Sequence, residues 1–201
     1  MSKIDFKPGN MLYPLPAVLI SCGNKQTTNL FTVAWAGTVC TNPPMVSISV
    51  RPERYSYDLI RESKEFAINL TTSELAFATD FCGVRSGRDV DKWKECRLTP
   101  IEASEIHCPL VKESPVNIEC RVTEIKELGS HHMFIADVVA VHVDDKWMDE
   151  NNTFHLNNAK PLAYSHGTYF TLGKPLGKFG YSVRKKQSPS HSKKTKKKRR
   201  K

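Results

Sequence analysis

Residues 29–57 read NLFTVAWAGTVCTNPPMVSISVRPERYSY, and the rest of the chain is organised around this stretch. It holds two apolar runs rich in β-branched residues, separated by the breaker TNPP at residues 41–44. Two such runs on either side of a turn signal are typical of paired strands. The hydroxyl of Ser56 then precedes a helical pattern. The stretch therefore predicts strand, turn, strand and the entry to a helix.

The same stretch favours a phosphorylated, planar ligand. In residues 35–38 (WAGT) a large flat ring is followed by very small residues, so that a flat ligand can lie against the backbone. One strand later, Arg51, Tyr55 and Ser56 supply the donors that a phosphate group needs. A helix that begins near Ser56 adds its free N–H groups. A ring site and a phosphate site are thus predicted one strand apart.

Simpler interpretations exist for each of these residues. Trp35 can be interpreted as an aromatic residue of the core, and Gly37 as the glycine of a β-bulge. Arg51 would form a surface ion pair if Glu53 or Asp58 were its partner. Arg54 is interpreted as a surface residue.

Three segments, in this order, resemble the flavin reductase-like family, the FMN-binding split barrels that include flavoredoxin. The first is Asn29-x-x-Thr32-x-x-Trp35-x-Gly37, followed by Pro43-Pro44-x-Val46-x-Ile48-x-Val50-Arg51 and Tyr55-Ser56. The second is Cys82-Gly83-x-x-Ser86-Gly87-x-x-x-Asp91-Lys92. The third is Gly129-x-His131-x-x-Phe134-Ile135-x-Asp137-Val138. The similarity covers roughly residues 10–180. Ala136 stands where the family pattern commonly has Gly.

The resemblance implies FMN as the cofactor and a homodimer with FMN near the subunit interface. The residues expected to bind the cofactor are Asn29, Thr32, Trp35, Ala36, Gly37, Thr38, Val50, Arg51, Tyr55, Ser56, Cys82, Gly83, Ser86, Gly87 and Lys92. The expected catalytic residue is His131, which would contact nicotinamide or a substrate. Its neighbour His132 is an alternative for the inward position. For Cys82 to Gly87, a helix end followed by a surface loop is the simpler alternative.

The remaining pattern predicts a mainly β fold. Strands are expected in the ranges 17–22, 66–70, 116–125, 132–144 and 164–170, and short helices in 57–63, 75–81 and 89–94. Residues 71–73 would cap the second helix, and Gly83 would end it. Consecutive strands favour a closed antiparallel barrel, and the resemblance implies a Greek-key split barrel. The strand at 132–144 is apolar on both faces, which is expected where a barrel core covers one face and a partner subunit the other.

The formal net charge of +9 comes from the end of the chain. Residues 184–201 carry eleven Lys or Arg and no Asp or Glu, which leaves 19 basic and 21 acidic residues elsewhere. We expect a flavin reductase-like FMN-binding domain over residues 1–183 and a disordered basic tail over 184–201. The tail either binds nucleic acid electrostatically or is a solvated extension.

The six cysteines form no C-x-x-C pair and no zinc-type spacing, so no metal site is expected. The chain lacks a recognisable signal peptide and any apolar run of about 18 residues, which predicts a cytoplasmic protein with free thiols. The glycines do not form G-x-G-x-x-G after a strand, so a Rossmann nicotinamide site is not expected.

The sequence therefore predicts an FMN-binding oxidoreductase, an NAD(P)H-dependent flavin (FMN) reductase. A flavin carries its own redox chemistry, so the protein needs a cradle and no catalytic triad. One alternative is a flavoredoxin-type electron-transfer protein without nicotinamide activity. The other is a nucleic-acid-associated protein that acts through its basic tail.

Overall fold

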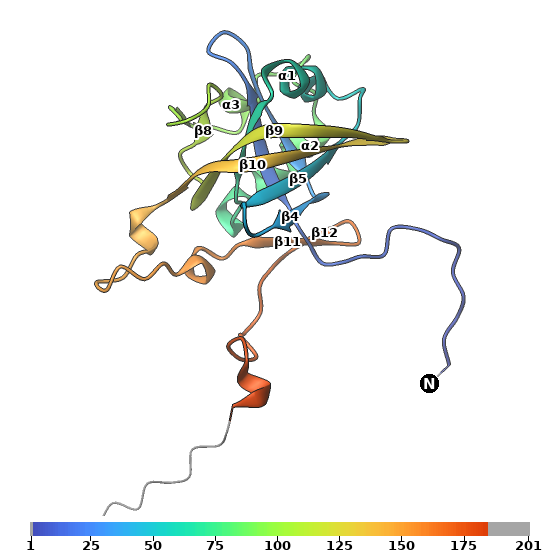
Figure 1. Cartoon of the computed structure of the whole chain (residues 1–201), viewed down its shortest axis with the longest axis vertical. Coiled ribbons are helices and arrows are strands. Elements are labelled where there is room, and N and C mark those ends of the chain that lie inside the picture. The colour runs from blue at the N-terminus through green and yellow to red at the C-terminus, as the bar shows by residue number, and fades with distance from the viewer. Residues whose placement is uncertain (1, 185–201) are drawn as a thin grey trace, which may run out of the picture.

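The structure is a computed structural model that describes residues 2–184. Its centre is a seven-stranded antiparallel sheet in the order β3-β2-β6-β9-β10-β5-β4 (Figure 1). The strands are β2 (Val18–Gly23), β3 (Thr28–Val33), β4 (Ala36–Cys40), β5 (Met45–Val50), β6 (Glu65–Asn69), β9 (Val116–Leu128) and β10 (His131–Val143). The expected mainly β, antiparallel architecture is confirmed.

Smaller elements surround this sheet. A second sheet joins β1 (Leu15–Pro16), β11 (Leu162–Ser165) and β12 (Thr168–Thr171), and a third pairs β7 (Pro100–Ile101) with β8 (Leu110–Val111). The helices are α1 (Tyr55–Ser63), α2 (Ala76–Val84) and α3 (Lys92–Glu95), and the 3-10 turns are η1 (Ser73–Leu75), η2 (Asp145–Trp147), η3 (Leu156–Ala159) and η4 (Tyr181–Val183). No helix within residues 2–184 has the length and apolarity needed to cross a membrane.

Alternation along the strands decides which side chains enter the core. In β5, Val46, Ile48 and Val50 are buried, while the intervening residues are only half-buried. The buried set packs with Phe66 and Phe134, both fully buried, in the largest apolar cluster. Because side chains alternate between the two faces of a strand, the serines of β5 lie on the opposite face.

Within residues 29–57 the structure contains three strands, one more than expected. The first apolar run divides into β3 and β4 at Ala34 and Trp35. The predicted turn at residues 41–44 does join β4 and β5, which pair antiparallel. The Trp35 carbonyl accepts a hydrogen bond of 2.9 Å from the Ser49 N–H, so the break still lies against β5. Trp35 is therefore at a junction between strands, where the residue is 40% exposed.

Three local predictions are wrong. Helix α2 does not stop at Gly83 but continues to Val84, because Gly83 does not adopt the positive φ with which a glycine ends a helix. The hydroxyls of residues 71–73 form no side-chain cap, since Thr72 precedes a 3-10 turn and not the α-helix itself. The segment 164–170 is no single strand: His166 and Gly167 have positive φ values of 47° and 78° and form the turn between β11 and β12.

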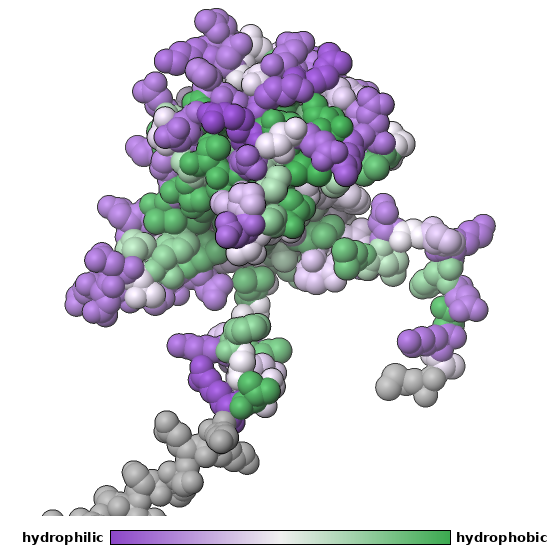
Figure 2. Space-filling model, viewed as in Figure 1, coloured by the Kyte–Doolittle hydropathy of each residue, from purple (hydrophilic) through white to green (hydrophobic). Residues whose placement is uncertain are grey.

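The long strand β10 is covered on both faces, but partly by its own chain. Phe134 and Ala136 face the main core, and Ala136 is fully buried. Val139 packs against a cluster that includes Ile106 and Leu110, which come from the excursion between α3 and β9. Val141 remains 55% exposed. Figure 2 shows hydrophilic residues over the region of α1 and apolar residues gathered over the sheet below it.

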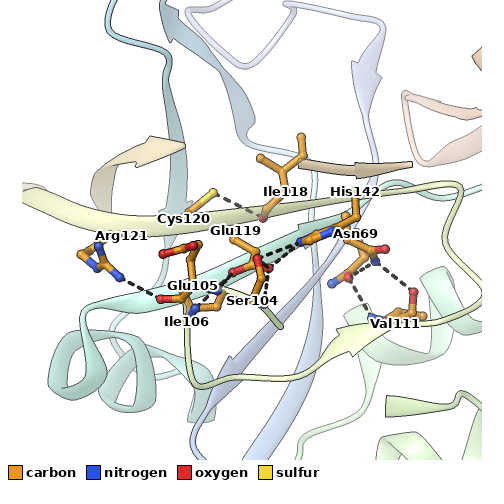
Figure 3. A network of polar contacts seen from close by, with 11 residues as sticks. Asn69, Ser104, Glu105, Ile106, Val111, Ile118, Glu119, Cys120, Arg121 and His142 are labelled. Carbon is orange, nitrogen blue, oxygen red and sulfur yellow. Dashed lines mark hydrogen bonds and ion pairs between the residues drawn. The ribbon is translucent and has the colours of Figure 1, made fainter. Parts of the chain in front are cut away.

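A buried carboxylate ties this excursion to the sheet. Glu119 on β9 is fully buried and accepts backbone N–H bonds from Ser104, Glu105 and Ile106 at 2.8, 2.7 and 3.1 Å (Figure 3). The Nε2 atom of His142, on the neighbouring strand β10, lies 2.6 Å from the same carboxylate. Since buried charge is stable only when it is hydrogen-bonded, this network fixes the path of residues 100–111.

Candidate functional site

Two adjoining cavities lie where β3, β5 and α2 meet. The Trp35 cavity, of about 500 Å³, is lined by Trp35 and His131, and the Lys92 cavity, of about 390 Å³, by Ser56, Ser86 and Lys92 among others. The two share a wall made of Phe31, Thr32, Arg51, Arg54 and Gly83. A single elongated ligand can therefore occupy both.

The Trp35 cavity has a flat aromatic boundary. The rings of Trp35 and His131 are nearly parallel, with an interplanar angle of 8° and centroids 6.1 Å apart. The break between β3 and β4 places Trp35 there, and the first residue of β10 places His131. Tyr164 and Tyr169 from the β11–β12 hairpin also line it. Aromatic faces of this kind suit a planar conjugated ring.

The structure distinguishes the two adjacent histidines. His131 lines the Trp35 cavity, while the Nδ1 atom of His132 lies 2.8 Å from the Tyr57 hydroxyl under the sheet. Burial, and then the positive charge of Arg51, lower the pKa of His131 below its ordinary value of 6.5. At neutral pH its imidazole is therefore uncharged, and each ring nitrogen is either a donor or an acceptor.

The Lys92 cavity is strongly basic. Four arginines line it together with Lys92, namely Arg51, Arg54, Arg85 and Arg88, against a single acidic residue, Glu53. Arg51 forms the ion pair with Glu53 that was the simpler interpretation of this residue, because the Arg51 Nη1 atom lies 3.1 Å from the Glu53 carboxylate. Arg88 lies over the Tyr55 ring at 5.4 Å and donates to the Glu53 carbonyl oxygen. Arg51 thus contacts Glu53 and still borders both cavities.

Lys92 is a buried cation without a counter-charge. Its side chain is held by the start of α3, which the Asp91 carboxylate caps by accepting from the N–H groups of Trp93 and Lys94. Only 3% of Lys92 is exposed, and its Nζ atom donates to the Cys82 carbonyl oxygen at 2.8 Å. Within the part of the chain that the structure describes, Lys92 forms no ion pair. Burial lowers its pKa from 10.5. An anion in this cavity would supply the missing charge.

Close packing holds the polar wall between α1 and β3. The Asn29 Nδ2 atom donates to the Ser56 hydroxyl at 2.7 Å, and both residues are buried. A Cβ atom at Gly87 would lie 2.2 Å from the Asn29 Oδ1 atom, so only glycine fits there. Thr32 donates its hydroxyl to the Thr79 carbonyl oxygen at 2.5 Å. The Thr32 hydroxyl proton is therefore engaged within the protein, and the Thr32 oxygen can still accept a hydrogen bond from a ligand.

Most of the predicted site residues come together. Those that line the two cavities are Asn29, Thr32, Trp35, Val50, Arg51, Tyr55, Ser56, Cys82, Gly83, Ser86, Gly87, Lys92 and His131. Ala36, Gly37 and Thr38 do not. Ala36 and Gly37 border a third cavity beside residues 9–15. Thr38 borders none of these three cavities. They belong to the paired strand β4, and no atom lies within 4 Å of a Cβ built on Gly37.

Sequence reasoning missed several lining residues. Arg54 is exposed, as expected, but it also lines both cavities, because α1 begins directly after it. Arg85 and Arg88 were not singled out, although the basic density of residues 85–92 (RSGRDVDK) around Ser86 and Gly87 was a usable signal. Tyr164 and Tyr169 gave no such signal. Among residues 2–184 no group of three or more His, Cys, Asp or Glu is placed to hold a metal ion.

Comparison with solved structures agrees with this architecture. Flavoredoxin of Desulfovibrio vulgaris (Miyazaki F) superposes with a TM-score of 0.83 at 26% identity, over 91% of this chain and 100% of that one. The split barrel domain of a Shewanella frigidimarina protein matches with a TM-score of 0.74 at 26% identity, over 84% of this chain and 86% of that one. The predicted split-barrel fold is thereby confirmed.

Sequence comparison points the same way. The NADH-dependent FMN reductase AsuE2 of Streptomyces nodosus subsp. asukaensis is 22% identical over 86% of each chain. The model of the flavin reductase like domain matches residues 11–173, which is most of the chain and includes both cavities except Asn10. The protein therefore belongs to the flavin reductase-like family.

Proposed function

We propose that the protein binds FMN and acts as an NAD(P)H-dependent flavin reductase. The observation that carries this proposal is the continuity of an aromatic cavity, bounded by Trp35 and His131, with a basic cavity around the buried Lys92. FMN has the same division into a flat tricyclic ring and a phosphate. Among flavin-binding relatives, AsuE2 is an NADH-dependent FMN reductase.

The Lys92 cavity is the proposed phosphate site. Lys92 is buried without a carboxylate partner among the described residues, so a phosphate restores charge balance there. Arg51 and Arg88 offer guanidinium donors, and the Ser56 hydroxyl and the N-terminal N–H groups of α1 add neutral donors. A monophosphate fits this donor set, which favours FMN as the cofactor.

The Trp35 cavity is the proposed ring and nicotinamide site. FMN supplies the redox chemistry when bound, because its ring accepts a hydride from a reduced nicotinamide. Thr32 and Val50 would border the ring, and Trp35 would limit access of water to it. The uncharged imidazole of His131 would orient the nicotinamide carboxamide by hydrogen bonding without adding positive charge.

The first test is the visible absorption spectrum of the purified, desalted protein, before and after anaerobic addition of NADH or NADPH. We expect flavin bands that survive desalting and bleach with the nicotinamide. The matched variants Lys92→Met and Lys94→Met separate the buried amine from an exposed one in the same helix. Only Lys92→Met should lose FMN, and equal retention by both variants would overturn the phosphate assignment.

A flavoredoxin-type electron carrier is the second candidate, favoured by the structural match to flavoredoxin. Such a protein would hold FMN permanently and exchange electrons with a redox protein. Steady-state oxidation of NADH or NADPH with added FMN separates the two functions. Turnover supports the reductase, whereas flavin bands that persist unbleached support the carrier.

Two further features belong to this proposal. We infer a homodimer with FMN near the interface, supported by the exposed Val39, Val141 and Val143 on β4 and β10, and a cytoplasmic protein, supported by six free cysteines. We also infer that residues 1–183 are the functional unit. The alternative of nucleic-acid binding rests on residues 184–201, all but the first of which lie outside the described residues.

A further inference from the structure

Two thiols meet at the wall of the Lys92 cavity, which Cys82 lines and Cys96 does not. The Sγ atoms of Cys82 and Cys96 lie 3.8 Å apart. Cys82 is near the end of α2 and fully buried, while Cys96 directly follows α3 and is half-buried. All six cysteines are within the described residues, and no other two thiols are in hydrogen-bonding contact. This pair is therefore chemically distinct from the other four thiols.

The pair joins the two ends of the segment that forms one wall of the cavity. Residues 85–91 connect α2 to α3 and bring Arg85, Gly87 and Arg88 to the cavity. Lys92, at the start of α3, donates from Nζ to the carbonyl oxygen of Cys82 itself. A covalent link between Cys82 and Cys96 would hold both ends of this wall in place, and with them the Lys92 amine.

We propose that Cys82 and Cys96 are a reversible dithiol–disulfide pair whose oxidation raises the affinity of the Lys92 cavity for the flavin phosphate. The affinity part of this proposal rests on the proposed function. A disulfide bond is about 2.05 Å long, so the two sulfur atoms need to approach by less than about 2 Å. The link would restrict residues 83–95 before the ligand arrives. A site that is already ordered loses less entropy on binding, which strengthens the complex.

The oxidant is a low-molecular-weight disulfide such as glutathione disulfide. The half-buried Cys96, as the thiolate, attacks one sulfur of that disulfide, forms a mixed disulfide and releases the first small thiol. The Cys82 thiolate then attacks the Cys96 sulfur, forms the intramolecular bond and releases the second small thiol. The two cysteine protons end on the two released thiols, so two protein thiols are oxidised and one small disulfide is reduced.

The environment of the pair sets its reactivity. Burial raises the pKa of Cys82 to about 12, and burial also raises the pKa of Cys96 above its usual 9.0. Since only the thiolate reacts, oxidation is slow at neutral pH and accelerates with increasing pH, by roughly tenfold per unit below the pKa.

Peptide mapping tests the covalent step. The purified full-length protein is incubated with glutathione disulfide at pH 7 and pH 9, its remaining thiols are blocked with iodoacetamide, and the digest is analysed by mass spectrometry. We expect a peptide that links Cys82 to Cys96, formed faster at pH 9 and reversed by dithiothreitol. Cys40→Ser, on the distant strand β4, should still form it, and Cys96→Ser should not. A stable glutathione adduct on Cys96 with Cys82 still free would overturn the proposal.

Fluorescence titration with FMN tests the consequence. We expect the oxidised protein to bind FMN with a Kd about fivefold lower than the reduced protein, and the oxidant to leave the Kd of Cys96→Ser unchanged. Equal Kd values for mapped disulfide and dithiol forms would overturn the effect on the cavity. Absence of FMN binding in both forms would instead contradict the proposed function, while the peptide map would still decide whether the disulfide forms.

Discussion

Gly87 is the residue whose side-chain size matters most for the proposed phosphate site. An added Cβ would lie 2.2 Å from the Asn29 Oδ1 atom and 2.8 Å from the Tyr55 ring, so Asn29 would have to release its hydrogen bond to Ser56. We predict that Gly87→Ala weakens FMN binding by at least about tenfold, roughly the value of one displaced buried hydrogen bond. Fluorescence titration measures this change.

Gly173 provides the control for that substitution. No atom lies within 4 Å of a Cβ built on Gly173, and its φ is not in the positive range that favours glycine. Gly173→Ala should bind FMN as the wild type does. If Gly87→Ala also binds as the wild type does while its circular dichroism is native, the wall between Asn29 and Ser56 has no part in holding the ligand.

We predict that the pKa of His131 lies below the ordinary histidine value, partly because of the positive charge of Arg51. Burial and then Arg51 lower its pKa from 6.5, so the unfolded chain takes up the proton first. The contribution of His131 to the free energy of unfolding therefore falls as the pH drops below about 6.5. We predict that Arg51→Gln raises the His131 pKa toward 6.5. Imidazole proton–carbon NMR titration of the flavin-free protein measures it, and a wild-type value at or above 6.5 would contradict the prediction.

Among the elements, the excursion between α3 and β9 depends on one carboxylate. Glu119 accepts three backbone N–H groups and faces the His142 Nε2 atom. A glutamine side chain has one acceptor oxygen and one NH₂ donor group. In Glu119→Gln this NH₂ group would face backbone N–H donors in a buried site, where neither can find an acceptor. We predict a loss of about 2–4 kcal/mol in the free energy of unfolding. Urea denaturation at pH 7 measures it, and Glu105→Gln, whose side chain is exposed, should change it little.

The same network predicts a dependence on pH. Burial alone would raise the pKa of Glu119, but the hydrogen bonds from Ser104, Glu105 and His142 outweigh it and lower the pKa below 4.5. The stabilisation is therefore present above about pH 4.5 and is lost as the pH falls through the lower, folded-state pKa. Wild type and Glu119→Gln should consequently differ less in stability under acid conditions than at pH 7. A difference that does not shrink on acidification would contradict this assignment.

These elements also show what the sequence could predict. The turn at residues 41–44 was predictable, because proline and asparagine interrupt two β-branched runs and few other structures suit that pattern. The break at Trp35 was not, since apolar residues stand on both sides of it and the nearest breaker, Gly37, lies inside β4 and not at the break. Likewise, Arg85 and Arg88 reach the Lys92 cavity only because α2 packs on β3, which is a tertiary contact that no local pattern records.

The prediction for the strand at 132–144 was partly right for a related reason. Its two apolar faces correctly indicated a doubly covered strand. One cover is the core, and the other comes in part from Ile106 and Leu110 of the same chain. Periodicity reports that a face is buried and does not identify what buries it. The case for a second subunit therefore rests on the residues of β4 and β10 that are still exposed.

For the whole molecule, this exposed surface predicts the oligomeric state. Val39, Val141 and Val143 are 50%, 55% and 42% exposed, and both ends of the described chain extend away from the sheets (Figure 1). We predict a dimer in which Val141 is buried, so that Val141→Asp shifts the protein to monomer. Sedimentation velocity measures this, with Phe77→Asp on α2 as the control, because Phe77 is an apolar residue that is even more exposed than Val141. A wild type that is monomeric at all concentrations would contradict it.

Removal of the basic segment at residues 184–201 distinguishes the proposed flavin function from the alternative of nucleic-acid binding. Removing residues 184–201 leaves 19 basic and 21 acidic residues, so the net charge changes sign. Both proposed cavities are formed entirely by residues before this segment. We predict that the truncated chain binds FMN with a Kd within about twofold of the full chain, because screening confines the influence of distant charges to about 10 Å. Any binding of duplex DNA should be salt-dependent in the full chain and absent from the truncated one. A full chain that binds DNA but takes up no flavin would instead make the tail the functional part.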